Sequence, residues 1–334
     1  MHDLLPQPLA AARQLIAAVP ELAGHVPAIA ARSGEAAFKR FIEFFATTIS
    51  NPNTRAAYVR AVSSFLSWQE DRRPGETFLD IEPMDVSAYV RHVEASRSVV
   101  TAKQHLSAIR RLFDWLVTGH IVIVNPATSV KGPSHSVAKG KTPYLTPDQV
   151  KQLIESIALD TITGYRDRAL IAVMAYTFAR ISAALAMDVS DIFQQGRTLW
   201  VRLHEKGGKA HQMPCHHRLT EHLDAYLSEA RLSPEEPLFQ SATRARQPVL
   251  TGKRLNRFNA LDMVKRRAIA AGLPVDTCNH TFRATGITTF LENGGLREQA
   301  QRMAAHSDPK TTAIYDRRSD AVTVSEIERI RYEE

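Results

Sequence analysis

The stretch "RTLWVRLHEKGGKAHQMPC", residues 197–215, decides the fold class, because it carries the one clear β signal in the sequence. Its two flanks contain alternating, aromatic and β-branched residues, and they enclose the pair Gly207 and Gly208. A Gly-Gly turn between two such runs is typical of a β-hairpin. We therefore expect one small β-sheet in a chain whose other segments have helical spacing.

The segments on both sides of this hairpin predict helices. Thr146 is a candidate N-cap, and Pro147 follows it at the first helical position. Helical spacing continues through 165–178 and 180–187, and it returns after the hairpin. Residues 144–320 are therefore expected to form a mainly α domain with a small β-sheet.

The first part of the chain predicts a bundle of about four helices without strands. In "FKRFIEFFATTI", residues 38–49, Phe and Ile recur at helical spacing. The last of these helices has Thr101 as a candidate cap and Gly119 as a stop. We assign residues 35–130 to this helical domain and residues 1–34 to an N-terminal extension. Polar residues of the last helix are expected opposite its apolar stripe: Lys103, His105, Arg110 and Arg111.

Residues 131–143 predict a basic linker between the two domains. Small residues and prolines leave no periodicity in this segment, and Lys131, Lys139 and Lys141 give it positive charge. The end of the chain, 321–334, has the opposite character. Its apolar residues recur at roughly helical spacing and predict a tail helix: Val322, Val324, Ile327 and Ile330.

The charge of the chain favours a polyanionic partner. The formal net charge is +7 and the sequence pI is near 9.5, and lysines and arginines bind nucleic acid by neutralising phosphates. No apolar run is long enough to span a membrane, and two cysteines cannot form a disulfide framework, which suits a reducing cytoplasm. Basic residues gather where Asp262 is the only acid: Arg244, Arg246, Lys253, Arg254, Arg257, Lys265, Arg266 and Arg267.

Tyr315 ends the polar segment "HSDPKTTAIY" and is a candidate nucleophile. Ionising a tyrosine at pH 7 costs about 4 kcal/mol, so a reactive tyrosine needs a base or cationic surroundings. Attack on a phosphodiester also needs arginine donors for the non-bridging oxygens and an acid for the leaving 5′-hydroxyl. Each candidate partner, taken alone, also has a simple structural interpretation as a packed, ion-paired or solvated side chain: Arg180, Lys206, His280, Arg283 and His306.

Four motifs in order, "ARIS", "KGGKAHQMP", "HTFR" and "HSDPKTTAIY", resemble those of the tyrosine recombinase (phage integrase) family. The resemblance extends from about residue 36 to residue 320. It implies that Tyr315 forms a 3′-phosphotyrosyl link to DNA and that Arg180 and Arg283 bind the scissile phosphate. It further implies that Lys206 protonates the leaving 5′-hydroxyl, that His280 handles the tyrosine proton and that His306 supports the phosphate.

The resemblance also implies a fold, partners and a function. The helical core-binding domain and the mixed catalytic domain would form a clamp around duplex DNA, and the enzyme would exchange strands between two sites without metal or cofactor. Its site would be a pair of inverted half-sites bound by a homotetramer, with the tail docking in trans. Accessory DNA-bending proteins are further candidate partners, and the expected location is the cytoplasm, on the nucleoid. The expected DNA-binding residues are Lys103, Arg110, Arg111, Lys131, Lys139, Lys141, Lys209, Arg254 and Arg257.

Some features depart from the family pattern or favour another function. Ala183 stands where the family often has an acidic residue, so either another acid substitutes beside Arg180 or the activity is lower. The alternatives are a type IB topoisomerase-like enzyme and an architectural DNA-binding protein without catalysis. A crowded group suggests zinc, but adjacent histidines do not easily bind one ion and the usual paired spacing is absent, so we expect no metal: His204, His211, Cys215, His216 and His217.

Overall fold

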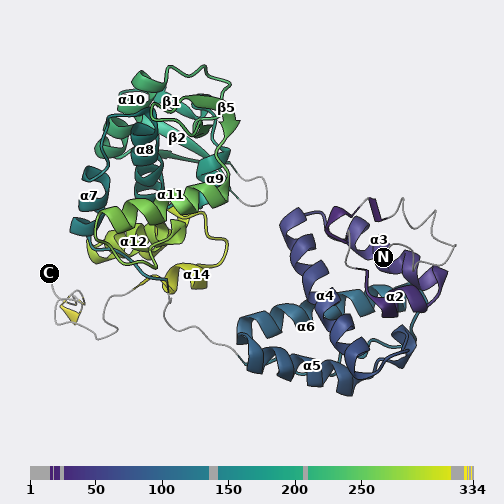
Figure 1. Ribbon diagram of the computed structural model, residues 1–334. Helices are drawn as coiled ribbons and strands as arrows, with labels where there is room; N and C mark the ends of the chain where they lie inside the picture. The colour runs from purple at the N-terminus through teal and green to yellow at the C-terminus, as the bar shows by residue number, and fades with distance from the viewer. Residues whose placement is uncertain are drawn as a thin grey trace. The chain divides into compact units, whose positions relative to one another are not determined.

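The computed structural model describes residues 16–17, 19–22, 26–134, 142–205, 210–316, 327–328, 330 and 332 (Figure 1). The chain divides into two compact units, Met1–Ser136 and Val137–Glu334. The sequence placed the linker between domains at 131–143. Among the described residues, no helix is long and apolar enough to cross a membrane.

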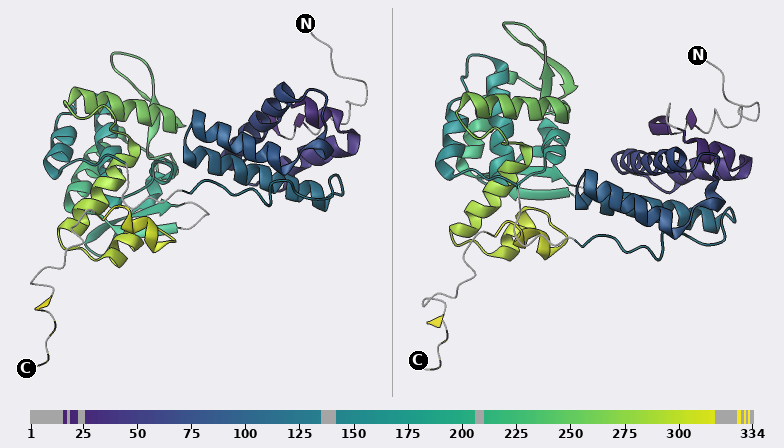
Figure 2. Two further views of the ribbon diagram at one scale, coloured as in Figure 1. Left: turned by 90° about the horizontal axis from the view of Figure 1, so that it is seen from below. Right: turned by 60° about the horizontal axis from the view of Figure 1, so that its bottom comes forward.

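Unit 1 is a helical bundle, as every view shows (Figures 1 and 2). Side-chain caps begin its two longest helices: Asn51 accepts from the backbone of Asn53 and Thr54, and Ser98 accepts from the backbone of Thr101. The last helix therefore begins before the predicted cap Thr101, which lies inside it. The elements are η1 (Pro20–Leu22), α2 (Ala28–Arg32), α3 (Glu35–Thr47), α4 (Pro52–Arg72), η2 (Phe78–Asp80), α5 (Pro83–Ser96) and α6 (Val99–Thr118).

The core of unit 1 is aromatic and lies around α6. Phe41 contacts the rings of Phe45 and Phe78, and Phe78 in turn contacts Phe113 of α6. Such ring pairs add to the stabilisation that burial alone provides. His105, which the sequence placed on the polar face, is buried instead. Its Nδ1 lies 2.8 Å from the hydroxyl of Tyr89, so this buried ring nitrogen has a hydrogen-bond partner.

Unit 2 contains the predicted hairpin inside a shell of helices. Strands β1, β2 and β3 form an antiparallel sheet in that order, and His204 and Ala210 are the paired residues nearest to the connection between β2 and β3. A second two-stranded sheet, β4–β5, was not predicted from the sequence. The strands are β1 (Ile192–Gln195), β2 (Thr198–His204), β3 (Ala210–Pro214), β4 (Gln240–Ala242) and β5 (Leu250–Arg254).

Helix α8 is the centre of unit 2. Its residues from Ala169 to Met174 are all buried, and α10 and α12 pack against it. Thr146 caps α7 with Pro147 at the first helical position, as the sequence predicts. The helical elements are α7 (Pro147–Glu155), α8 (Ile162–Thr177), α9 (Ile181–Ala186), η3 (Val189–Asp191), α10 (His217–Ala230), α11 (Arg257–Ala270), α12 (Asn279–Glu292), α13 (Arg297–Met303) and α14 (Pro309–Ala313).

Candidate active site

Tyr315 lies directly beyond α14, in contact with two of the predicted site residues. Its hydroxyl is 2.7 Å from Nε2 of His280 on α12, and its ring stacks on His306 at a centroid distance of 5.9 Å. The hydroxyl of Thr288 donates to the backbone carbonyl of Tyr315 at 3.0 Å. Tyr315 is therefore buried and fixed in position at both ends of the residue.

Arg283 is one of the most deeply buried side chains of unit 2, at 1% exposure. It lies on α12, one helical turn after His280, and its two terminal nitrogens donate to the carbonyls of Phe178 and Ala304. These carbonyls lie just beyond the C-terminal ends of α8 and α13, where helices leave acceptors unpaired. Arg283 therefore connects three helices as well as facing the tyrosine.

Arg180 occupies the N-cap position of α9 and is one-third exposed. Its Nη1 lies 2.5 Å from Oε2 of Glu205, which follows β2 and is buried. Arg180 therefore has an acidic partner although position 183 is an alanine. Sequence reasoning missed Glu205, although it is the only acid in the otherwise basic "HEKGGK".

The electrostatics of the site follow from burial and from the two arginines. Burial lowers the pKa of His280, and Arg283 and Arg180 lower it further. The same causes, burial first, lower the pKa of His306 to about 3. Burial raises the pKa of the Tyr315 hydroxyl, whereas the two arginines act to lower it. Both histidines are therefore neutral at pH 7, and His280 can accept a proton from Tyr315 through Nε2.

Burial, with a smaller effect from Arg180, lowers the pKa of Arg283 to about 10, and Glu205 opposes that shift. The guanidinium of Arg283 therefore stays charged at neutral pH. Five of the six predicted catalytic residues lie in unit 2 within the described part of the chain. The sixth, Lys206, lies outside the described residues, as do three of the predicted DNA-binding lysines: Lys139, Lys141 and Lys209.

Three predicted DNA-binding residues meet on α6. Lys103, Arg110 and Arg111 line one pocket of about 250 Å³ in unit 1, together with Gly132. Arg110 also donates to the carbonyls of Ala127 and Val130, so part of its donor set anchors the segment that follows α6. Lys131 is exposed.

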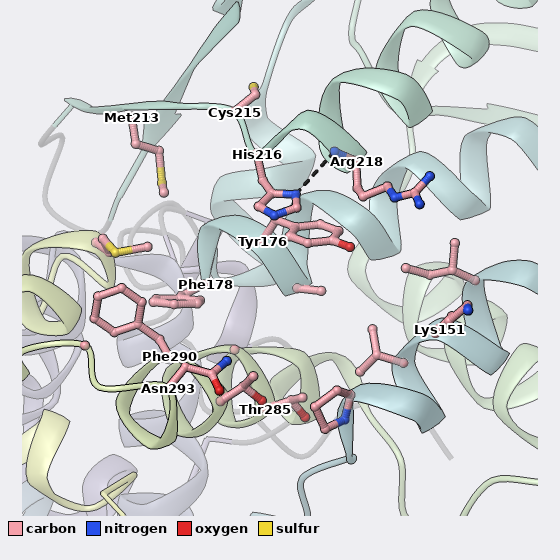
Figure 3. Close-up of a pocket in the computed structure, with 18 of the residues that line it drawn as sticks. Lys151, Tyr176, Phe178, Met213, Cys215, His216, Arg218, Thr285, Phe290 and Asn293 are labelled. Carbon is pink, nitrogen blue, oxygen red and sulfur yellow. Dashed lines mark hydrogen bonds between the residues drawn. The ribbon is translucent and has the colours of Figure 1, made fainter. Parts of the chain in front are cut away.

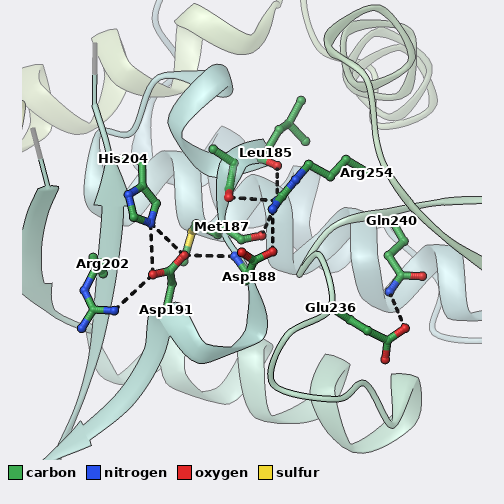
Figure 4. Close-up of polar contacts among 10 residues, drawn as sticks. Leu185, Met187, Asp188, Asp191, Arg202, His204, Glu236, Gln240 and Arg254 are labelled. Carbon is green, nitrogen blue, oxygen red and sulfur yellow. Dashed lines mark hydrogen bonds and ion pairs between the residues drawn. The ribbon is translucent and has the colours of Figure 1, made fainter. Parts of the chain in front are cut away.

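The structure gives Arg254 an intramolecular role that the sequence did not suggest. Its Nη1 donates to the carbonyls at the end of α9, with distances of 3.2 Å to Leu185, 2.8 Å to Ala186 and 2.9 Å to Met187 (Figure 4). Its Nη2 lies 2.5 Å from Asp188. Arg257, at the start of α11, is exposed, so its charge is available to a partner.

Two of the histidines considered for zinc have other contacts. His204 lies 3.0 Å from Asp191, and His216 caps α10 while stacking on Tyr176 at 4.7 Å (Figure 3). The part of the chain that the structure describes contains no group of three or more His, Cys, Asp or Glu residues able to hold a metal ion.

A mainly helical, two-unit protein with a buried Tyr–His–Arg site is the class that the tyrosine recombinase motifs predicted. Residues 143–321 match the phage integrase family, and residues 38–120 match its N-terminal SAM-like domain. Tyrosine recombinase XerD of Mycobacterium leprae (strain TN) is 31% identical over 277 residues, covering 79% of this chain and 86% of that protein. Tyrosine recombinase XerD of Oceanobacillus iheyensis is 27% identical over 272 residues, with coverages of 79% and 86%.

Solved structures show the same fold. The XerH site-specific recombinase, in a post-cleavage complex with palindromic difH substrate, has a TM-score of 0.68 at 18% identity and covers 91% of this chain and 85% of that chain. A lambda integrase dimer bound to a COC′ core site has a TM-score of 0.66 at 16% identity, with coverages of 86% and 98%. The chain belongs to the phage integrase family and is a tyrosine recombinase that acts in site-specific recombination. The predicted fold class and the predicted function, site-specific recombination, are confirmed. The relatives support this function and not the topoisomerase-like or the architectural alternative.

Proposed function

We propose that Tyr315 is the nucleophile of DNA strand exchange and that His280 is the base that accepts its proton. The observation that carries this proposal is the 2.7 Å contact between the Tyr315 hydroxyl and Nε2 of a neutral His280. The tyrosine oxygen attacks the scissile phosphorus, the bond to the 5′-oxygen breaks, and the tyrosine proton passes to His280. In the reverse step, a 5′-hydroxyl of the partner strand attacks the phosphotyrosine and releases Tyr315.

The arginines supply the charge that this reaction needs. Arg180, one-third exposed, is accessible to a phosphate oxygen from solvent, whereas buried Arg283 stays fixed by its two carbonyl contacts. Guanidinium donors placed before the reaction stabilise developing charge without reorganisation. Lys206 protonates the leaving 5′-oxygen, and His306 supports the phosphate beside Tyr315. No cofactor is consumed, because the phosphotyrosine conserves the energy of the broken bond.

The proposed substrate is duplex DNA with inverted half-sites, bound by a homotetramer. The pocket lined by Lys103, Arg110 and Arg111 gives unit 1 a basic face on α6, and Arg257 gives unit 2 an exposed basic residue. Among the structurally similar proteins, lambda integrase is bound as a dimer to a COC′ core site and as a tetramer to a Holliday junction. Because DNA is the substrate, we place the protein on the nucleoid, and accessory DNA-bending proteins stay candidate partners.

The tail is proposed to dock on the catalytic unit of a second copy. Three apolar side chains of the tail are exposed: Ile327, Ile330 and Tyr332. Unit 2 contains an apolar pocket of about 1050 Å³ (Figure 3), which we propose as the docking site for the tail of a second copy. Phe178 lines this pocket and also accepts the hydrogen bond of Arg283, so an occupied pocket restrains the helix end that Arg283 contacts. Docking would thereby couple assembly to the site.

Tail deletion tests the assembly. Removing residues from Thr323 onwards should leave binding to one half-site intact but abolish cooperative binding to two, and strand exchange between two sites should fall further than binding. Phe290→Ser in the pocket should reproduce the loss of cooperativity in the full chain. If the truncated protein fills paired half-sites as cooperatively as the full chain, the tail has no role between subunits.

A further inference from the structure

Glu205 is a buried acid in a site that must receive a phosphate. It is 7% exposed, and Arg180, at 2.5 Å, is its one ion-pair partner within the described part of the chain. A buried carboxylate is unfavourable unless it is paired, and it repels an approaching phosphate. Its position therefore requires an explanation beyond packing.

Helix α9 itself offers Arg180 no acid. Ala183, one turn further along the helix, is buried in the apolar core at 1% exposure. The acidic partner therefore comes from another part of the unit, the residue that directly follows β2. Glu205 also lies directly before Lys206 in the sequence, so one short segment carries both the carboxylate and the proposed general acid.

Polar contacts join the segment that follows α9 to the end of β2, the strand that precedes Glu205 (Figure 4). Asp191 lies 3.0 Å from the backbone nitrogen of Asp188 and 3.0 Å from Nε2 of His204, the residue before Glu205. Arg254 binds the end of α9, the helix that begins after Arg180, and Asp188 as well. These contacts hold the elements that carry Arg180 and Glu205 together within unit 2.

We propose that Glu205 is the positioning carboxylate of Arg180 and replaces the acid absent at Ala183. It engages Nη1, and the remaining N–H groups of the exposed guanidinium are then oriented for the non-bridging oxygens. Its negative charge also offsets the repulsion between Arg180 and Arg283 before DNA binds. This inference rests on the function proposed above, in which both arginines bind the scissile phosphate.

The expected signature separates chemistry from binding. Glu205→Gln keeps the shape of the side chain and removes its charge, so the cleavage rate constant should fall about 10- to 100-fold, the cost of misplacing a reacting group by about 1 Å. Half-site affinity should stay equal or increase, because a negative charge near the phosphate is lost. Glu221→Gln is the matched control, since Glu221 pairs with Arg218 on the exposed face of α10 at 2.9 Å.

The test uses the full chain on a nicked suicide duplex that carries its mapped cleavage site. A second duplex carries a neutral methylphosphonate at the scissile position, which needs less charge neutralisation from arginine. If Glu205 acts through Arg180, Glu205→Gln should cleave this duplex nearly as fast as the wild type. In the Arg180→Lys background, Glu205→Gln should add little further loss, because residues that act as a unit are not additive.

Three outcomes overturn the inference: wild-type cleavage by Glu205→Gln, an equal loss on the methylphosphonate duplex, or full additivity with Arg180→Lys. Thermal unfolding is followed in parallel. If Glu205→Gln does not fold, Glu205→Asp, which keeps the charge on a shorter side chain, replaces it. Its cleavage rate must then fall, by a smaller factor than that expected for Glu205→Gln, on the phosphate duplex and not on the methylphosphonate duplex. A wild-type chain that forms no covalent adduct would instead contradict the proposed function itself.

Discussion

Replacement of Arg283 by lysine should destabilise unit 2 although the charge is kept. Arg283 donates to the carbonyls of both Phe178 and Ala304, and a hydrogen bond from a charged group contributes about 1.5–3 kcal/mol. A lysine ammonium reaches at most one of these carbonyls, so the expected loss is about 2 kcal/mol. For a unit of this size, that loss lowers Tm by about 4–8 °C.

Differential scanning calorimetry of the full chain, without DNA, measures this effect as a shift of the unit 2 transition. Arg302→Lys is the matched control, because Arg302 lies on α13 with an exposed side chain. Arg283→Lys should also lose covalent adduct formation, since a lysine ammonium cannot contact the two carbonyls and the phosphate at once. If Arg283→Lys unfolds at the wild-type temperature, the two carbonyl contacts do not hold the helices together as argued.

Three further predictions address separate residues. His306 has a pKa of about 3 in the folded chain and 6.5 as a free side chain. Between these values the unfolded chain binds more protons, so the free energy of unfolding falls as the pH drops, by about 2 kcal/mol at pH 5. His306→Gln should remove this pH dependence in urea titrations. Arg254→Gln should lower the free energy of unfolding by about 1–3 kcal/mol without changing the salt dependence of DNA binding. Arg257→Gln should leave stability unchanged and reduce by about 0.9 the slope of the logarithm of the DNA-binding constant against the logarithm of the salt concentration. The reverse result would make Arg254 the DNA contact. Lys206→Ala should slow cleavage by about 10²–10⁴-fold, and a 5′-thiol leaving group should restore most of the rate; if Lys209→Ala behaves in this way instead, the acid is the other lysine.

Local patterns predicted those parts of the fold that depend on neighbours in sequence. The alternating runs on either side of Gly207 and Gly208 predicted the β2–β3 hairpin, and Thr146 with Pro147 predicted the start of α7. The β4–β5 pair escaped prediction because β4 has three residues, too few for an alternating pattern. The partner strand β5 lies in the basic stretch that was interpreted from the sequence only as a cluster of charge.

The site was predictable where a motif names a residue and unpredictable where tertiary packing selects the partner. The motifs named Tyr315, His280 and Arg283, which the structure brings together. No spacing rule connects Arg180 with Glu205, because α9 and β2 meet only in the folded unit. For the same reason, charge alone did not separate Arg254, whose donors bind carbonyls, from exposed Arg257.

Peptide mapping of the trapped adduct shows whether Tyr315 becomes joined to DNA. The wild-type chain is reacted with a nicked suicide duplex, digested with nuclease and trypsin, and analysed by mass spectrometry, with Tyr315→Phe as the control. Trypsin releases peptide 311–317, in which Tyr315 is the only tyrosine. This peptide should carry the 3′-phosphonucleotide in the wild type, and Tyr315→Phe should form no adduct. A nucleotide on another peptide, or an undiminished adduct in Tyr315→Phe, would contradict the role of Tyr315 as nucleophile.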